Sequence, residues 1–235
     1  MFTFLDRFGF TARLLWILQW SSRRYNSQYL LRIDDDHFLC LERLLYELPF
    51  RPKKALYWGF VHCHPNIVRV DEAWLILTQD LVKEILSKAE TTLPCHPHGD
   101  QAVAMWINNS TYNVTYFMDN RRIVHKIAGH DPRYYKRRVC EEYLSLHGVF
   151  DQEMRKFWLV SHKLYRQRFD AMPQYNVTRI RPFNTLCPHA KVFSTNGFYP
   201  EYRYEPRPCR MSPTWSISQR EHAAREETGE RYSSY

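Results

Sequence analysis

The sequence has no apolar run long enough to cross a membrane. Its most apolar early stretch, residues 14–18, ends at Gln19 and is far shorter than the roughly 20 residues that a spanning helix needs. Arg7 and Arg13 interrupt the first stretch, so it also lacks the continuous apolar core of a secretory signal peptide. We therefore expect either a cytosolic protein or a chain whose targeting segment precedes residue 1.

Also absent is any cysteine pair in the C-x-x-C spacing, which removes thioredoxin-like redox motifs and zinc ribbons from consideration. The six cysteines are scattered at positions 40, 63, 95, 140, 187 and 209. An even number permits disulfides in an oxidising compartment, but the spacing does not indicate which cysteines pair. Sequons for N-glycosylation, which favour a luminal setting mildly, begin at Asn108, Asn109, Asn113 and Asn176.

No helix-turn-helix, RNA-recognition or zinc-finger signature is present, so the formal net charge of +8 is not evidence for nucleic acid. A basic surface also attracts nucleotide-sugars, acidic glycans and membrane headgroups. We expect no nucleic-acid partner. The chain does have 44% hydrophobic residues, enough for the core of one ordinary domain, and we expect most of its aromatic rings to fill that core.

Apolar runs and amphipathic segments alternate through the first half of the chain. Short runs that fit buried strands lie at residues 29–33, 57–61 and 74–77. Apolar residues at helical spacing lie at residues 11–20, 41–48 and 81–86. Strands that alternate with helices predict an α/β fold, with a mixed sheet flanked by helices.

The pattern fades beyond about Ala171, where Pro, Arg, Tyr and Ser dominate, and the chain ends in a polar, charged stretch. Such a composition buries too little apolar surface to order a compact domain. We therefore predict a domain over residues 1–165 and an irregular, partly disordered C-terminal extension over residues 166–235.

Three consecutive carboxylates, Asp34, Asp35 and Asp36, follow the apolar run at residues 29–33. Adjacent anions repel one another, so this arrangement is tolerated where water or a cation neutralises it. Ligands of α/β proteins bind at the carboxyl ends of strands, and hard oxygen ligands there suit Mg²⁺ or Mn²⁺. The alternative is a solvated acidic turn before the helix near Leu41, where negative charge favours the helix N-terminus.

Segments along the chain resemble the beta-1,3-galactosyltransferase family, with its proteoglycan linkage-region branch the most similar. Residues 4–48 resemble that family's helix ending in Trp, its next strand and its Asp-x-Asp motif. Further matches in the family's order are LYWGF at 56–60, WLILTQDLV at 74–82, GDQAVAMWI at 99–107, HDPR at 130–133 and HGVFDQEMRKFW at 147–158. Together the matches cover roughly residues 4–158.

The resemblance implies a GT-A fold, a Rossmann-like sheet that binds a UDP-sugar with Mn²⁺. Carried over to this sequence, Asp34 and Asp35 would bind the donor, Asp36 and His147 would ligate the metal, and Asp100 would be the general base. Imidazole with carboxylate suits Mn²⁺, and the metal would neutralise the departing diphosphate. The implied reaction is an inverting transfer of a hexose, with galactose favoured, to a glycan or glycoprotein hydroxyl in beta-1,3 linkage.

The same resemblance places the protein at the Golgi membrane, facing the lumen, in protein glycosylation or proteoglycan assembly. Few residues precede the Asp triplet, so the resemblance also implies that the chain is incomplete at its N-terminus. We expect a membrane anchor and the remaining donor-binding strands in that missing region.

The sequence departs from the family at two points near the expected site. Asp71, Glu72 and Ala73 stand where the family has three glycines, and Gly99 stands where the family has a Glu before its catalytic Asp. Added bulk and charge close to the ligand interfere with its binding. An inactive glycosyltransferase-like protein that only binds a glycan or a partner is therefore an open alternative. Asp100 is also a plausible helix cap, and His147 is also a plausible surface histidine.

A zinc-binding structural module is the third reading. Imidazole and thiolate ligands are available from His62, Cys63, His64, Cys95, His96 and His98. Their spacing matches no zinc-finger pattern, so this reading is the least favoured of the three.

Overall fold

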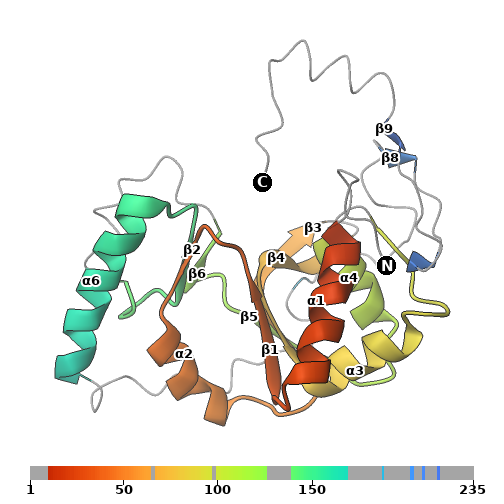
Figure 1. The fold of residues 1–235 in the computed structure, drawn as a ribbon, viewed down its shortest axis with the longest axis horizontal. Coiled ribbons are helices and arrows are strands. Elements are labelled where there is room, and N and C mark those ends of the chain that lie inside the picture. The colour runs from red at the N-terminus through yellow and green to blue at the C-terminus, as the bar shows by residue number, and fades with distance from the viewer. Residues whose placement is uncertain are drawn as a thin grey trace.

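The computed structural model describes residues 10–64, 67–96, 99–125 and 139–168, together with Cys187, 202–203, 208–209 and 216–217. Within these residues the chain is an α/β protein in which mixed sheets are flanked by helices, as the sequence predicted (Figure 1). None of the helices in these residues has the length and apolar character needed to span a membrane.

The main sheet has four strands in the order β1-β4-β3-β5. Its strands are β1 (Tyr29–Ile33), β3 (Leu56–His64), β4 (Ile67–Thr78) and β5 (Thr115–Met118). Strand β4 pairs antiparallel with both β1 and β3, and β5 runs parallel to β3. The apolar runs at 57–61 and 74–77 therefore belong to one long hairpin. The sequence pattern did not show this, because the first half of β4 carries charged residues.

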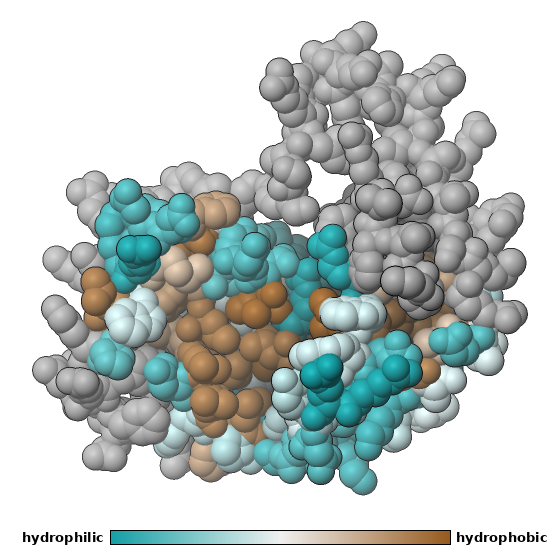
Figure 2. Space-filling view, in the orientation of Figure 1, coloured by the Kyte–Doolittle hydropathy of each residue, from teal (hydrophilic) through white to brown (hydrophobic). Residues whose placement is uncertain are grey.

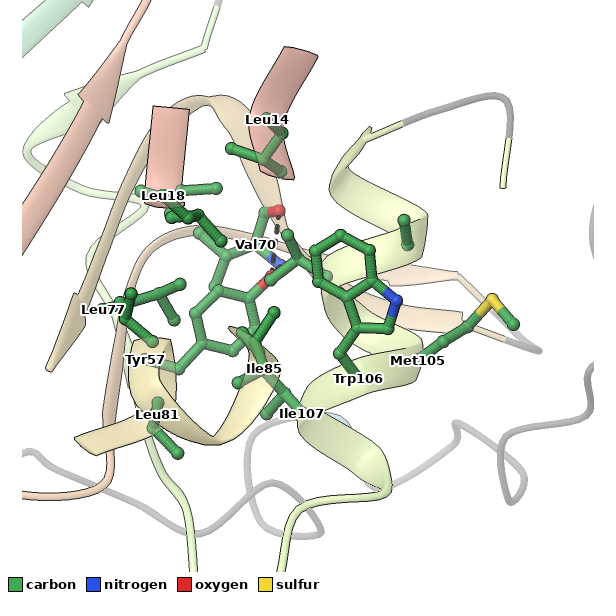
Figure 3. Close-up of a cluster of buried hydrophobic side chains, with 14 of the residues drawn as sticks. Leu14, Leu18, Tyr57, Val70, Leu77, Leu81, Ile85, Met105, Trp106 and Ile107 are labelled. Atoms are coloured by element: carbon green, nitrogen blue, oxygen red, sulfur yellow. Dashed lines mark hydrogen bonds between the residues drawn. The ribbon is translucent and has the colours of Figure 1, made fainter. Parts of the chain in front are cut away.

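Three helices cover one face of this sheet (Figure 1). They are α1 (Phe10–Arg24), α3 (Gln79–Lys88) and α4 (Gly99–Asn108). Side chains alternate between the two faces of a strand, so Tyr57, Leu75 and Leu77 point toward these helices and form the first core. Figure 3 shows this core, in which the backbone N–H of Val70 donates to the Tyr57 hydroxyl at 3.2 Å.

The opposite face of the main sheet buries Trp58, Trp74 and Ile76 in a second core. A smaller sheet of order β2-β7-β6 contributes to this core, with β2 (His37–Leu39), β7 (Ser145–His147) and β6 (Ile123–Val124). The helices α2 (Leu41–Glu47) and α6 (Asp151–Arg168) pack here too, and a short 3-10 turn (Leu48–Phe50) follows α2. A third pair, β8 (Tyr202–Arg203) with β9 (Ser216–Ile217), is antiparallel.

Helix α2 begins where the sequence predicted it, but its apolar stripe is only partly buried. Leu44 is in the core, whereas Leu41 and Leu45 are 50% and 55% exposed. The buried positions of the helix also include Arg43 and Glu47, because ion pairs hold them there.

Figure 2 shows apolar side chains gathered on the surface between α6 and the main-sheet helices.

Two disulfides cross-link distant parts of the chain. One joins Cys40, before α2, to Cys140, and the other joins Cys63 in β3 to Cys187. Cys95 and Cys209 are buried thiols, and burial followed by the hydrogen bond between them raises the pKa of Cys209.

The predicted domain boundary at residues 165 and 166 falls inside α6. Cys187 and Cys209, both from the predicted extension, lie in the first core. Most of the remaining extension, the sequon at Asn176 and the HDPR string at 130–133 lie outside the described residues.

Substituting Gly59 by alanine should lower the free energy of unfolding by about 1–3 kcal/mol through overpacking. A Cβ at this position would lie 2.6 Å from the backbone oxygen of Trp74 and closer still to the Val70 side chain. Urea denaturation measures the change in the free energy of unfolding. The control is Ala55→Gly directly before β3, where φ is 52° and glycine relieves strain, so the free energy of unfolding should hold or rise. Equal losses from both variants would show that the space around Gly59 is not the cause.

Candidate functional site

The Asp triplet forms the tight turn between β1 and β2, at the carboxyl end of β1 as the sequence predicted. The backbone N–H of Asp34 donates to the Ala73 carbonyl at 3.0 Å, which fixes the turn against β4. Asp34 forms an ion pair with Arg32 at 2.8 Å, and Asp35 is exposed at the tip of the turn. Burial raises the pKa of Asp34, and the neighbouring Arg32 only partly offsets this.

Asp36 and His147, distant in sequence, meet because β2 pairs with β7. The antiparallel register places His37 opposite His147, and His147 Nε2 lies 3.2 Å from Asp36 Oδ2. The other ring nitrogen, Nδ1, contacts the backbone carbonyl of His125. A carbonyl can only accept, so Nδ1 donates and the lone pair of a neutral His147 is on Nε2, facing Asp36. A hydrogen bond of this kind commonly orients a metal-ligating histidine.

His37 belongs to the same group, and the sequence interpretation missed it. Its Nδ1 lies 2.9 Å from the Ser145 hydroxyl, which itself donates to the Phe38 carbonyl at 3.1 Å, so Nδ1 is the donor. The Nε2 atom is buried and has no hydrogen-bond partner within the described part of the chain. Burial, with His147 nearby, lowers the pKa of His37 to about 3, so the ring is neutral and its lone pair is available.

Asp36, His37 and His147 therefore offer one carboxylate and two imidazoles, with ligand atoms within 4.8 Å of one another. The rings of His37 and His147 are stacked, with centroids 4.4 Å apart. The orphaned Nε2 of His37 and this donor set both fit a divalent cation such as Mn²⁺. The only sequence signal for His37 was its place directly after the Asp triplet.

A row of charged side chains leads from the turn toward α4. Burial, followed by the charge of Asp100, raises the pKa of Glu72 to about 8, while Arg32 works in the opposite direction. A Cβ on Gly99 would overlap the Glu72 carboxylate. The two departures from the family pattern are thus linked, since Gly99 leaves the space that Glu72 occupies.

Asp100 lies at the far end of this row, with Arg69 and Glu72 as its neighbours rather than Asp36 and His147. Arg69 Nε donates to Asp100 Oδ2, and the backbone N–H of Gln101 donates to Oδ1 at 2.7 Å. Both carboxylate oxygens therefore have a partner. The contact with Gln101 gives Asp100 a local structural role whatever chemistry it performs.

His62, Asp71 and His125 form a second cluster next to the first. Asp71 Oδ2 lies 2.6 Å from His62 Nε2 and 3.1 Å from His125 Nδ1. Burial works to raise the pKa of Asp71, but the hydrogen bond from His62 and the charge of His125 hold it well below its ordinary value. Burial lowers the pKa of His125.

Among the described residues, the alternative zinc module of six cysteine and histidine residues is not assembled as one group. Cys63 is in a disulfide and offers no thiolate, and Cys95 is hydrogen-bonded to Cys209. Of the six residues, His62 is in a metal-capable cluster, with Asp71 and His125 as its companions. The side chains of His64 and His98 lie outside the described residues.

No protein-family model and no curated protein matches the chain.

Proposed function

We propose that this chain is a metal-dependent glycosyltransferase of GT-A type that transfers a hexose from a UDP-sugar to a glycan hydroxyl. The observation that supports it most is the meeting of Asp36 and His147 at 3.2 Å, at the carboxyl end of β1. The family resemblance predicts this pair as metal ligands, and residues so distant in sequence meet there only because β2 and β7 pair.

We assign donor binding to the turn between β1 and β2 and to the residues beside it. Asp36, His37 and His147 would hold Mn²⁺, which supplies positive charge to the diphosphate of the donor. Asp34, oriented by Arg32, accepts hydrogen bonds from hydroxyls of the ribose or the sugar, and the exposed Asp35 can do the same.

Proton transfer falls to the carboxylates beside α4. Asp100, which pairs with Arg69 and accepts from the Gln101 N–H, accepts the proton of the acceptor hydroxyl as that oxygen attacks the anomeric carbon opposite the leaving diphosphate. A single displacement of this kind inverts the anomeric centre and gives a beta linkage. Glu72, with its pKa of about 8, is mostly protonated at neutral pH and can donate a hydrogen bond to the substrate.

Galactose is the favoured donor sugar, and a glycan or glycoprotein is the acceptor, in beta-1,3 linkage. The setting we propose is the Golgi lumen, in protein glycosylation or proteoglycan assembly. The two disulfides support this setting, because such cross-links persist in oxidising compartments.

An inactive glycosyltransferase-like binding protein is the second candidate. The engagement of both Asp100 oxygens, by Arg69 and by Gln101, favours it. Such a protein would bind the nucleotide with metal but would not turn over the UDP-sugar.

Calorimetric titration with UDP tests the metal-dependent donor site. We expect Mn²⁺ to strengthen UDP binding by at least about tenfold, since a cation held by Asp36, His37 and His147 would supply positive charge to the diphosphate. The Asp36→Asn variant should lose most of that gain, whereas Glu42→Gln, an exposed change on α2, should keep it. Binding of UDP that is equal with and without Mn²⁺, or sugar transfer undiminished in EDTA, would contradict the proposal.

A further inference from the structure

We propose that His62, Asp71 and His125 form a second metal site, which takes a divalent transition-metal ion of the zinc class. The proposal rests on the geometry of these three side chains and does not depend on the glycosyltransferase function. Asp71 stands where the resembling family has a glycine, so the site is a property of this chain's own residues.

The spacing of the ligand atoms is close to what zinc requires. Ligand atoms about 2.0–2.1 Å from a tetrahedral Zn²⁺ lie about 3.3 Å from one another. Two of the three edges, from Asp71 Oδ2 to His62 Nε2 and to His125 Nδ1, are 2.6 and 3.1 Å. The 2.6 Å edge must widen by about 0.7 Å, and all three atoms lie within 4.8 Å of one another, so side-chain rotations that move the ligand atoms by less than about 1 Å complete the geometry.

The surrounding residues hold these ligands in place. The backbone N–H of Ala73 donates to Asp71 Oδ1 at 2.8 Å, which leaves Oδ2 directed at the two rings. Phe60 backs both histidines, with its ring centroid 5.0 Å from that of His62 and 5.0 Å from that of His125. Ordered outer contacts and an apolar backing of this kind are what fix the ligands of metal sites.

One side of the cluster is open to solvent. The side chains of His62 and Asp71 are 17% and 12% exposed, whereas that of His125 is 39% exposed. Three protein ligands and an open position resemble a reactive zinc site, in which water or substrate is the fourth ligand, more than a closed structural site.

The second site touches the first without sharing a ligand. His147 Nδ1 donates to the backbone carbonyl of His125, and the two rings lie 5.6 Å apart between centroids. Because the shared contact uses the carbonyl, truncating the His125 side chain leaves the orientation of His147 intact. The two sites can therefore be emptied separately by substitution.

Elemental analysis of metal content tests the proposal on the intact oxidised protein. After treatment with EDTA and dialysis against excess Zn²⁺, the wild type should hold two equivalents of zinc. His62→Ala and His125→Ala should each hold one fewer, and Asp36→Asn should lose the other equivalent. His162→Ala, an exposed histidine on α6, is the matched control and should hold two.

A conservative variant separates loss of metal from loss of fold. Asp71→Asn keeps an oxygen for the Ala73 contact but removes the charge, so zinc affinity at this site should fall by at least about tenfold. The melting temperature of the metal-free protein should fall only slightly, by the loss of the ionic contacts with His62 and His125. Equal zinc content in the wild type, His62→Ala and His125→Ala would overturn the proposal and leave an Asp–His hydrogen-bond cluster. Two bound ions in a protein with no UDP-sugar turnover would leave this site standing while the proposed function fails.

Discussion

Substituting Asp100 by asparagine should reduce kcat for sugar transfer by about 10²–10⁴-fold, the usual contribution of a positioned general base. Asparagine keeps the size of the side chain and an oxygen for the Gln101 N–H, but it cannot accept the proton of the acceptor hydroxyl. Metal-dependent UDP affinity should stay near the wild-type value, because Asp36 and His147 are unchanged. Steady-state kinetics with a UDP-sugar, and UDP calorimetry on the same preparation, measure both quantities.

The ion pair with Arg69 complicates this experiment, because Asp100→Asn also weakens a contact between side chains that are only 13% and 9% exposed. We therefore expect a loss of stability as well, and Arg69→Gln is the matched control, since it breaks the same pair but leaves the carboxylate. Its melting temperature should fall similarly, while its kcat should change far less. Equal kcat losses from both variants would show that the ion pair is the cause, and full turnover in Asp100→Asn would remove this residue from the mechanism.

Substituting Glu47 by glutamine should lower the free energy of unfolding by about 3–5 kcal/mol, the usual effect of breaking a buried charge network by removing one partner. Glu47 Oε1 accepts from Arg43 at 3.2 Å and from Arg122 at 2.5 Å, and Oε2 accepts from Arg51 at 2.8 Å. Their side chains are at most 8% exposed, so the variant leaves arginine charges poorly compensated out of water. Urea denaturation measures the loss.

The dependence on pH gives a second test. Burial works to raise the pKa of Glu47, but hydrogen bonds and charges from Arg122 and Arg51 outweigh it and lower the pKa. A depressed carboxylate pKa contributes stability that is fully present above the unfolded value, near 4.5, and is lost as the pH falls through the folded value. The difference between wild type and Glu47→Gln should therefore shrink on acidification, and the exposed control Glu42→Gln should stay within about 0.5 kcal/mol at every pH.

This network also bears on the candidate metal site. The backbone carbonyl of Arg122 accepts from the N–H groups of Leu144 and Ser145, at the start of β7, the strand that carries His147. A variant that loosens Arg122 is thus expected to weaken Mn²⁺ binding as well as stability. Glu47→Gln would then lower the affinity for Mn²⁺ although Glu47 contacts none of the proposed metal ligands.

The sequence predicted those helices and strands whose buried face follows from local apolar spacing. The helices at 11–20 and 81–86 and the strand at 29–33 are found as α1, α3 and β1, because their apolar spacing decides which face is buried. The placement of Asp34 to Asp36 at a strand's carboxyl end followed from the same reasoning. That Asp36 would lie beside His147 came from the resemblance, since no local pattern links them.

The features that the sequence did not reveal depend on pairing between distant segments. His37 and His125 are single histidines, and only the pairing of β2 and β6 with β7 brings each beside His147. Arg43 and Glu47 lie among the leucines of α2, yet they are buried because Arg122 arrives from a distant part of the chain and Arg51 lies just past the helix, four residues after Glu47. Burial of charge depends on a partner that periodicity cannot show.

The positions of the disulfides decide how the protein should be produced. Cys63 directly follows His62, and Cys40 directly follows β2, the strand that begins with His37. In a reducing bacterial cytosol both cross-links would be absent, and the chain would carry four additional thiols, two of them in the segments that hold the histidine clusters. Thiolates are softer ligands than carboxylates and capture zinc readily, so such a preparation would bind metal at its cysteines as well as at the two histidine clusters. Material exported to an oxidising compartment, or refolded with a thiol–disulfide buffer, is therefore the preparation in which metal content reports on Asp36 and Asp71.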